Sequence, residues 1–271
     1  MLMASAVVIV AILFTLPKVV VENDEGQMAD SESTMSSADS QAEKVEDVHT
    51  TELGADVASE IITLKEKLSV AENNEKSIIF ADSLAKLYVK ANKYDSAAKF
   101  FEIIANIQPN EANWLKTGDT YYEAYGFAMD PVKRENLGKK AREYFDKVLN
   151  EDKDNLSAQN KIAMTYLSSQ NPMQGIMMLR EILVKDPQNE DALFNLGILS
   201  MQSGQYDKAV ERFNSLVEIY PSNTQAQFFL GVSLLEIGNK DKAKEQFKLV
   251  KSLDNDPAVQ ATVDTYLEDI E

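Results

Sequence analysis

The sequence contains no cysteine and a single histidine, His49, among its 271 residues. It therefore offers no disulfide, no thiolate nucleophile and no cysteine for lipid attachment, and one imidazole is little for metal binding or acid-base chemistry. Glycine-rich phosphate loops, nucleophile elbows and paired histidines at metal spacing are also absent from the sequence. We therefore expect no enzymatic activity, no cofactor, no metal site and no small-molecule substrate.

Basic residues are also scarce. The 27 Lys and Arg residues stand against 44 Asp and Glu residues, which gives a formal net charge of −17. A surplus of this size repels phosphate, and the sequence contains no basic run that could overcome the repulsion. The composition therefore predicts that nucleic acid is not a partner.

A long apolar run occurs once, at residues 1–21, which read MLMASAVVIVAILFTLPKVVV. About 20 residues of apolar helix cross the hydrocarbon core of a bilayer, and only Pro17 and Lys18 interrupt this run. We predict a transmembrane anchor. A cleaved signal peptide is the alternative, although no basic region precedes the run and no small-x-small cleavage site follows it. A buried core helix is disfavoured because the next thirty residues offer nothing for it to pack against.

Residues 22–53 are rich in Ser, Asp and Glu, with ten acids against Lys44 and almost no large apolar side chains. Such a segment cannot bury enough surface to offset the entropy lost on ordering. We predict a disordered acidic linker with a root-mean-square span of roughly 30 Å. Because nothing fixes the geometry of its side chains, His49 is interpreted as a solvated residue and not as a metal ligand.

A 34-residue pattern recurs along the rest of the chain and is clearest in residues 190–223, EDALFNLGILSMQSGQYDKAVERFNSLVEIYPSN. One helical face is formed by Leu193, Leu196, Gly197 and Ser200, and a second by Tyr206, Ala209, Phe213 and Leu216. Gly204 separates the two helices and Pro221 ends the second. Gly197 and Ala209 are small where the helices approach closely, and Phe213 fills the volume between them.

This order of Leu, Gly, aromatic, Ala, Phe and Pro resembles the tetratricopeptide repeat. The resemblance implies an all-α fold, a right-handed superhelical solenoid of antiparallel helix pairs. We place five repeats in residues 78–257, with bounds 78–111, 111–155, 156–189, 190–223 and 224–257. Capping helices are expected at 54–76 and 258–271, because the open ends of a solenoid need a polar outer face.

The repeats depart from the pattern in three places. Asn92 stands at a turn where glycine is more usual, and Gly175 replaces the usual alanine of the third repeat. The second repeat is 11 residues too long, and the excess lies at its turn. We expect both of its helices to be longer by about 1.5 turns, with Asp130 capping the second. The resulting hairpin either presents its aromatic residues to a partner or uses them to pack itself together. These residues are Tyr122, Tyr125 and Phe127.

In the family that the repeats resemble, residues of each first helix that are not used for packing line a concave groove. The corresponding residues here are Leu115, Tyr122, Asn160, Met164, Leu167, Phe194, Ile198, Met201, Phe228 and Val232, together with Asp119 and Leu235. Most are apolar where a solvent-facing helix should carry charge, which predicts a protein or peptide partner with apolar anchors. The alternative is that these residues pack across the tight inner curve.

The layout is similar to that of membrane-bound tetratricopeptide proteins of Bacteroidetes-type bacteria. It predicts a non-catalytic scaffold anchored by a single pass in the bacterial inner membrane. The alternative function is an assembly factor for an envelope complex, as in cytochrome c maturation or cell division. Lys18 alone would keep the repeats in the cytoplasm, whereas basic residues upstream of Met1 would place them outside. Between these, our working prediction is a periplasmic array.

Overall fold

The structure is a computed structural model that describes residues 54–270, so the predicted anchor and acidic linker lie outside the described residues. Every regular element in residues 54–270 is an α-helix. The helices are α2 (Ala55–Ser69), α3 (Asn74–Lys90), α4 (Tyr94–Ile107), α5 (Glu111–Phe127), α6 (Pro131–Glu151), α7 (Leu156–Leu167), α8 (Pro172–Lys185), α9 (Glu190–Gln202), α10 (Tyr206–Ile219), α11 (Thr224–Glu236), α12 (Lys240–Leu253) and α13 (Pro257–Ile270). The predicted all-α class is confirmed.

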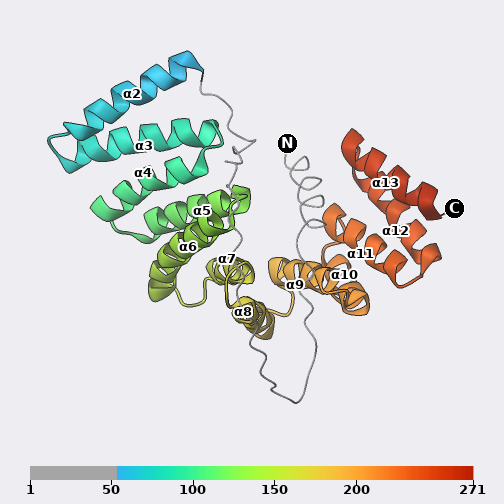
Figure 1. The fold of residues 1–271 in the computed structure, drawn as a ribbon. Helices are drawn as coiled ribbons and strands as arrows, with labels where there is room; N and C mark the ends of the chain where they lie inside the picture. The colour runs from blue at the N-terminus through green and yellow to red at the C-terminus, as the bar shows by residue number, and fades with distance from the viewer. Residues whose placement is uncertain (1–53, 271) are drawn as a thin grey trace, which may run out of the picture. The chain divides into compact units, whose positions relative to one another are not determined.

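The helices belong to two compact units, which divide between Glu181 and Ile182 within α8. We call the described residues 54–181 the N-terminal unit and residues 182–270 the C-terminal unit. Consecutive helices pack against one another from α2 through α7, and again from α9 through α13 (Figure 1). Both units are therefore stacks of helix hairpins, while the right-handed superhelical course stays a prediction.

In three of the five predicted repeats, a glycine of the first helix packs against a phenylalanine of the second. A Cβ placed on Gly197 would lie 2.7 Å from the ring of Phe213, which is fully buried. The same pairing recurs in two other repeats, as Gly118 with Phe145 and Gly231 with Phe247. Any larger residue at these glycines would push the ring out of the core. The sequence-based interpretation of Gly197, Ala209 and Phe213 is confirmed.

An asparagine side chain caps the first helix of each of the five predicted repeats. The oxygen of Asn73 accepts a hydrogen bond from the backbone N–H of Lys76 at 2.9 Å, and the oxygen of Asn223 accepts one from Ala226 at 2.8 Å. Asn110, Asn155 and Asn189 form the equivalent caps of α5, α7 and α9. Such a cap contributes about 1 kcal/mol and fixes where the helix starts. Accordingly α3 begins at Asn74, four residues before the predicted repeat start at Ile78.

The structure explains two departures from the repeat pattern, one at a turn and one inside helix α8. Asn92 has a φ of 56°, in the left-handed region that Gly204 occupies with a φ of 70°. Asparagine tolerates this conformation better than other residues with a side chain, which accounts for its place in the turn. At Gly175 a Cβ would overlap the carbonyl oxygen of Ala163. Only glycine therefore allows α8 to approach α7 this closely.

The extra residues of the second repeat lengthen both of its helices, but unequally. Helix α5 has 17 residues and α6 has 21, against 13 in α9 and 14 in α10. As predicted, Asp130 caps α6 by accepting a hydrogen bond from the N–H of Lys133. The aromatic rings pack the hairpin, since Tyr122 stacks on Tyr125 at 5.9 Å. Of the two alternatives left open from the sequence, this contact supports the one in which the aromatic residues pack the hairpin, although Phe127 stays 53% exposed.

Two side chains of the lengthened hairpin attach it to α7. The hydroxyl of Tyr125 donates to the carbonyl oxygen of Met164 at 3.1 Å, and burial raises the pKa of this phenol. Arg142 of α6 donates to the hydroxyl of Thr165 at 3.1 Å and lies 4.5 Å from the ring centroid of Tyr166. Helix α7 is thus held by both helices of the preceding repeat.

None of the helices within residues 54–270 combines the length and the apolar character needed to span a bilayer.

Candidate functional site

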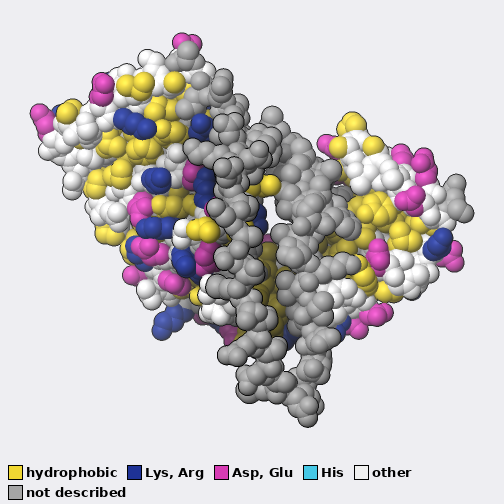
Figure 2. All heavy atoms as spheres, in the orientation of Figure 1, with side chains coloured by type: hydrophobic (Ala, Val, Ile, Leu, Met, Phe, Trp, Pro, Cys, Tyr) yellow, Lys and Arg dark blue, Asp and Glu magenta, His cyan; other side chains and the backbone are white. Residues whose placement is uncertain are grey.

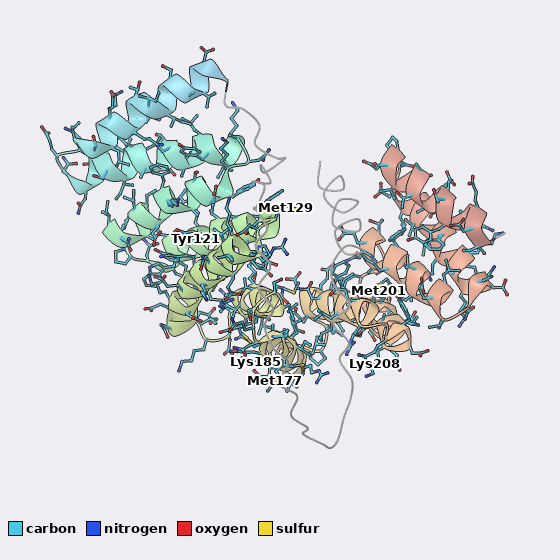
Figure 3. The ribbon with its side chains drawn as sticks, in the orientation of Figure 1. Tyr121, Met129, Met177, Lys185, Met201 and Lys208 are labelled. Atoms are coloured by element: carbon cyan, nitrogen blue, oxygen red, sulfur yellow. The ribbon has the colours of Figure 1, made fainter. Side chains whose placement is uncertain are left out.

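The first helices of the C-terminal unit carry almost no charge. The stretches 192–206 and 219–235, which contain most of α9 and α11, have no charged residue. Large apolar side chains of these two helices are half-buried and pack against the core while keeping part of their surface exposed. They are Phe194, Ile198, Met201, Phe228, Phe229 and Leu235. Figure 2 shows a continuous apolar area over α11 to α13, and Figure 3 places Met201 towards the end of α9.

Aromatic contacts place Phe194 and Phe228 in the core as well as on the inner surface. The ring centroid of Phe194 lies 6.0 Å from that of Phe213, which is fully buried. Phe228 lies 5.8 Å from Phe247 and 5.4 Å from Tyr266 of α13. We predicted that these two phenylalanines stand apart from the packing residues. That prediction is wrong, because both side chains contact core rings of the packed helices, Phe194 those of Phe213 and Phe229, and Phe228 those of Phe247 and Tyr266.

Two of the predicted groove residues are buried. Asn160 of α7 is 7% exposed and Val232 of α11 is 6% exposed. Neither offers a surface to a partner in this structure, which corrects the prediction for these two side chains. They fit the alternative that was left open from the sequence, packing across the inner curve.

In the N-terminal unit the predicted groove residues are Leu115, Tyr122, Met164 and Leu167, and all four are half-buried. Leu115 and Tyr122 pack against the core formed by α4, α5, α6 and α7. Charged groups lie among them, since Lys161 forms an ion pair with Asp119. Burial raises the pKa of nearby Glu123, with Asp119 adding to the shift and Lys161 opposing it. The inner face is therefore mixed in this unit and not apolar.

A second charged contact in this unit was missed by the sequence-based interpretation. Asp82 of α3 forms ion pairs with Lys86 at 2.5 Å and with Lys116 of α5 at 3.7 Å. The ammonium group of Lys116 also lies 4.4 Å from the ring centroid of Phe101. The signal was available, because Asp82 and Lys86 hold the repeat positions of Phe194 and Ile198.

A polar network joins α4, α5 and α6. Glu102 accepts hydrogen bonds from the hydroxyl of Tyr121 at 2.6 Å and from the ammonium group of Lys140 at 2.9 Å. Burial alone would raise the pKa of Glu102, but these hydrogen bonds outweigh it and hold the pKa below the ordinary 4.5. Glu102 is therefore a fixed acceptor between helices. Figure 3 shows Tyr121 on α5.

Within residues 54–270, no group of three or more side chains is arranged to hold a metal ion.

The fold and these contacts define a helical repeat protein whose inner surfaces are built from the first helix of each repeat. Residues 168–227 and 200–263 match the family model of the tetratricopeptide repeat. Residues 168–263 therefore consist of tetratricopeptide repeats, as predicted from the sequence.

Three solved structures that match the chain share little sequence with it. A tetratricopeptide repeat protein from Parabacteroides merdae is 17% identical, with 79% of this chain and 82% of that chain covered and a TM-score of 0.55. The MamA protein is 19% identical, with coverages of 68% and 95% and a TM-score of 0.48. MamA from residue 41 onward of Desulfovibrio magneticus is 16% identical, with coverages of 68% and 97% and a TM-score of 0.49. The Parabacteroides structure supports the fold alone. No curated protein matches the sequence.

Proposed function

We propose that this protein is a non-catalytic scaffold whose C-terminal unit binds a segment of a partner protein through apolar anchors. The observation that carries the proposal is the near-absence of charge from α9 and α11, whose residues 192–202 and 224–235 include no charged side chain, combined with large apolar side chains that remain half-exposed. A helix face turned only towards water would carry charged or polar residues. Tetratricopeptide folds in general suit protein partners.

The partner segment is expected to be an amphipathic helix or an extended peptide. Ile198, Met201 and Leu235 offer side chains of different shape on two successive first helices. Methionine is flexible and adapts to several shapes of apolar anchor. Recognition by apolar anchors at regular spacing is a common way to bind a short segment. No small molecule is needed for this role.

The first experiment compares the full chain with an Ile198→Ser and Leu235→Ser double variant, each used to capture partners from detergent-solubilised membranes. We expect the wild type to retain one stoichiometric partner and the double variant to bind the purified partner at least tenfold more weakly, a loss of about 1.4 kcal/mol. The matched control is Val184→Ser, which removes an apolar side chain that is 83% exposed in the same unit.

The outcomes separate the possible roles. Melting temperatures of all variants distinguish lost binding from lost folding. Equal binding by wild type and a folded double variant would show that the apolar surface of α9 and α11 does not carry recognition. Recovery of many proteins in one assembly, in place of one partner, would favour the role of assembly factor for an envelope complex.

We further propose that residues 1–21 anchor the scaffold in the bacterial inner membrane, with the repeats in the periplasm. The support is the apolar run and the acidic stretch after it, which together would hold the repeats roughly 30 Å from the bilayer. The test is alkaline carbonate extraction followed by protease treatment of spheroplasts. Retention in the membrane with digestion of the repeats is expected. Release by carbonate would contradict the anchor, and protection from protease would place the repeats in the cytoplasm.

A further inference from the structure

Three positions of the repeat meet where one repeat packs on the next. Counted from the first residue of each predicted repeat, they are the fifth residue, the twenty-fourth, and the sixth of the following repeat. In the C-terminal unit these are Phe194, Phe213 and Phe229. Their ring centroids lie 5.8, 5.9 and 6.0 Å apart. Three aromatic rings therefore fill the interface between the two successive repeats, which we call the seam.

The same three positions in the N-terminal unit are Asp82, Phe101 and Lys116. Phe101 is 4% exposed and keeps the place of Phe213. The other two rings are replaced by the thin side chains of an ion pair, in which Lys116 lies over the ring of Phe101. A carboxylate and an ammonium group occupy less width than two phenyl rings, so the seam is left partly unfilled.

The result is a hollow of about 160 Å³ between α3, α4 and α5. Ile78, Phe101 and Ile104 contribute its apolar lining. Its polar lining, which we call the rim, consists of Asp82, Gln108, Asn113 and Lys116. An apolar cavity of about 150 Å³ accepts a benzene molecule, so the hollow has room for one phenyl ring. The C-terminal unit shows which chemical group fits this place, because it supplies the rings from its own chain.

The charged side chains at and beside the hollow carry one net positive charge. Asp82 and Lys116 line the hollow, and Lys86, which lies outside its lining, forms a second ion pair with Asp82. The side chains of the two lysines are 67% and 50% exposed. In a chain with a net charge of −17, a local surplus of lysine favours an anionic group beside the occupant.

We propose that this hollow is a second binding site, which takes an aromatic side chain of a partner protein flanked by a carboxylate that pairs with Lys86 and Lys116. The proposal rests on the proposed function only in that the chain binds protein segments, and it uses none of the residues of the C-terminal unit. The chain's own N-terminal residues do not meet this chemistry. Residues 22–53 contain no aromatic residue, and Phe14 has no acidic neighbour.

The test uses methyl NMR of the full chain in detergent micelles, with labelled isoleucine, and three capped tripeptides as probes. Acetyl-Glu-Phe-Glu-amide should shift the methyl signals of Ile78 and Ile104 in a saturable way. Acetyl-Glu-Ala-Glu-amide should bind at least tenfold more weakly, because it lacks the phenyl ring whose burial favours binding. Acetyl-Lys-Phe-Lys-amide should bind several-fold more weakly, since it replaces exposed ion pairs, which contribute modestly, by like charges.

A double variant, Asp82→Phe with Lys116→Phe, installs the residues that the C-terminal unit uses at the same positions. It should fill the hollow, abolish the shifts and keep the helix content of the wild type. Lys116→Gln should weaken the Glu-Phe-Glu probe several-fold. Lys139→Gln is the matched control, because Lys139 is also an exposed, ion-paired lysine, 62% exposed and on the neighbouring helix α6, and it should change nothing.

Equal affinity for the Phe and Ala probes, or shifts that persist in the filled double variant, would overturn the proposal. If the double variant fails to fold, Ile78→Trp fills the hollow from its half-buried edge and provides the same test. All of these methyl signals come from the N-terminal unit. If the probes fail to bind there while the partner still binds through Ile198 and Leu235, the second site is refuted and the proposed function stands.

Discussion

The N-terminal and C-terminal units build the same helix hairpins but give their inner helices different chemistry. In the C-terminal unit rings meet at the seam between repeats, whereas in the N-terminal unit a lysine lies over the aromatic ring of the preceding repeat. Lys116 lies over Phe101, and Lys161 lies 5.7 Å from the ring centroid of Phe145. The glycine and phenylalanine columns specify the fold, and the positions beside them are free to differ. The repeat pattern alone therefore does not specify the binding surface.

The two seams also differ in what they contribute to stability. An aromatic pair contributes about 0.5 to 1.5 kcal/mol beyond the burial of its area. An exposed ion pair contributes about 0 to 1 kcal/mol. The C-terminal unit consequently uses the same side chains for folding and for its inner surface, while the N-terminal unit can change its charged residues at little cost to folding.

The largest effect should come from removing α13 by ending the chain at Asp256. Tyr266 stacks on Phe247 at 5.0 Å and Val263 is fully buried, so the truncation exposes the last seam. Coupling in a solenoid runs between neighbours. Hydrogen exchange should show loss of protection in α11 and α12, with α3 to α6 almost unchanged. Uniform loss along the chain would mean that the array folds as one cooperative unit.

The next largest effect should come from removing the phenylalanine that holds the same repeat position in each unit. Phe213→Ala should cost about 3 to 5 kcal/mol of unfolding free energy, because it leaves a cavity in a filled seam. Phe101→Ala should cost less, about 2 to 3 kcal/mol, because Phe101 already borders a hollow. Urea unfolding of both variants provides the measurement. A loss for Phe101→Ala as large as that for Phe213→Ala would contradict the difference between the seams.

The smallest effect concerns the polar contacts of the N-terminal unit. Glu102→Gln should cost about 1 kcal/mol at neutral pH, because it weakens the hydrogen bonds from Tyr121 and Lys140. The folded-state pKa of Glu102 lies below 4.5, so its stabilisation is present above pH 4.5 and is lost as the pH falls through the folded pKa. The difference in stability between wild type and variant should therefore shrink below pH 4.5.

The control for this acid titration is Glu143→Gln. Glu143 also pairs with Lys140, but its side chain is 49% exposed. Its removal should be nearly neutral at every pH. The free energy of unfolding of the wild type and of Glu102→Gln is compared at pH 7 and pH 3. An equal difference at both pH values would show that the charge of Glu102 is not what stabilises the helix contacts.

The helix pairs could be predicted from the sequence because their spacing has a single physical solution. Gly197 and Phe213 must face each other, and a residue such as Asn92 is needed where the backbone is left-handed. The surfaces could be predicted only in part. Periodicity assigns Phe194 and Val232 to an inner face, but it does not say how far the next helix covers that face. That coverage depends on contacts between residues about 34 positions apart.

The attachment of α7 by Tyr125 and Arg142 has a consequence for the response of the array to mechanical load. Repeat proteins under tension release their hairpins one after another, because each hairpin is held only by its neighbours. Here the lengthened second repeat holds α7 at Met164 and Thr165 by hydrogen bonds from two different helices. Helices α5, α6 and α7 should consequently detach as one block. The hairpin of α5 and α6 then acts as a brace that sets where the N-terminal unit yields, and of its two attachments only Tyr125 comes from the additional residues.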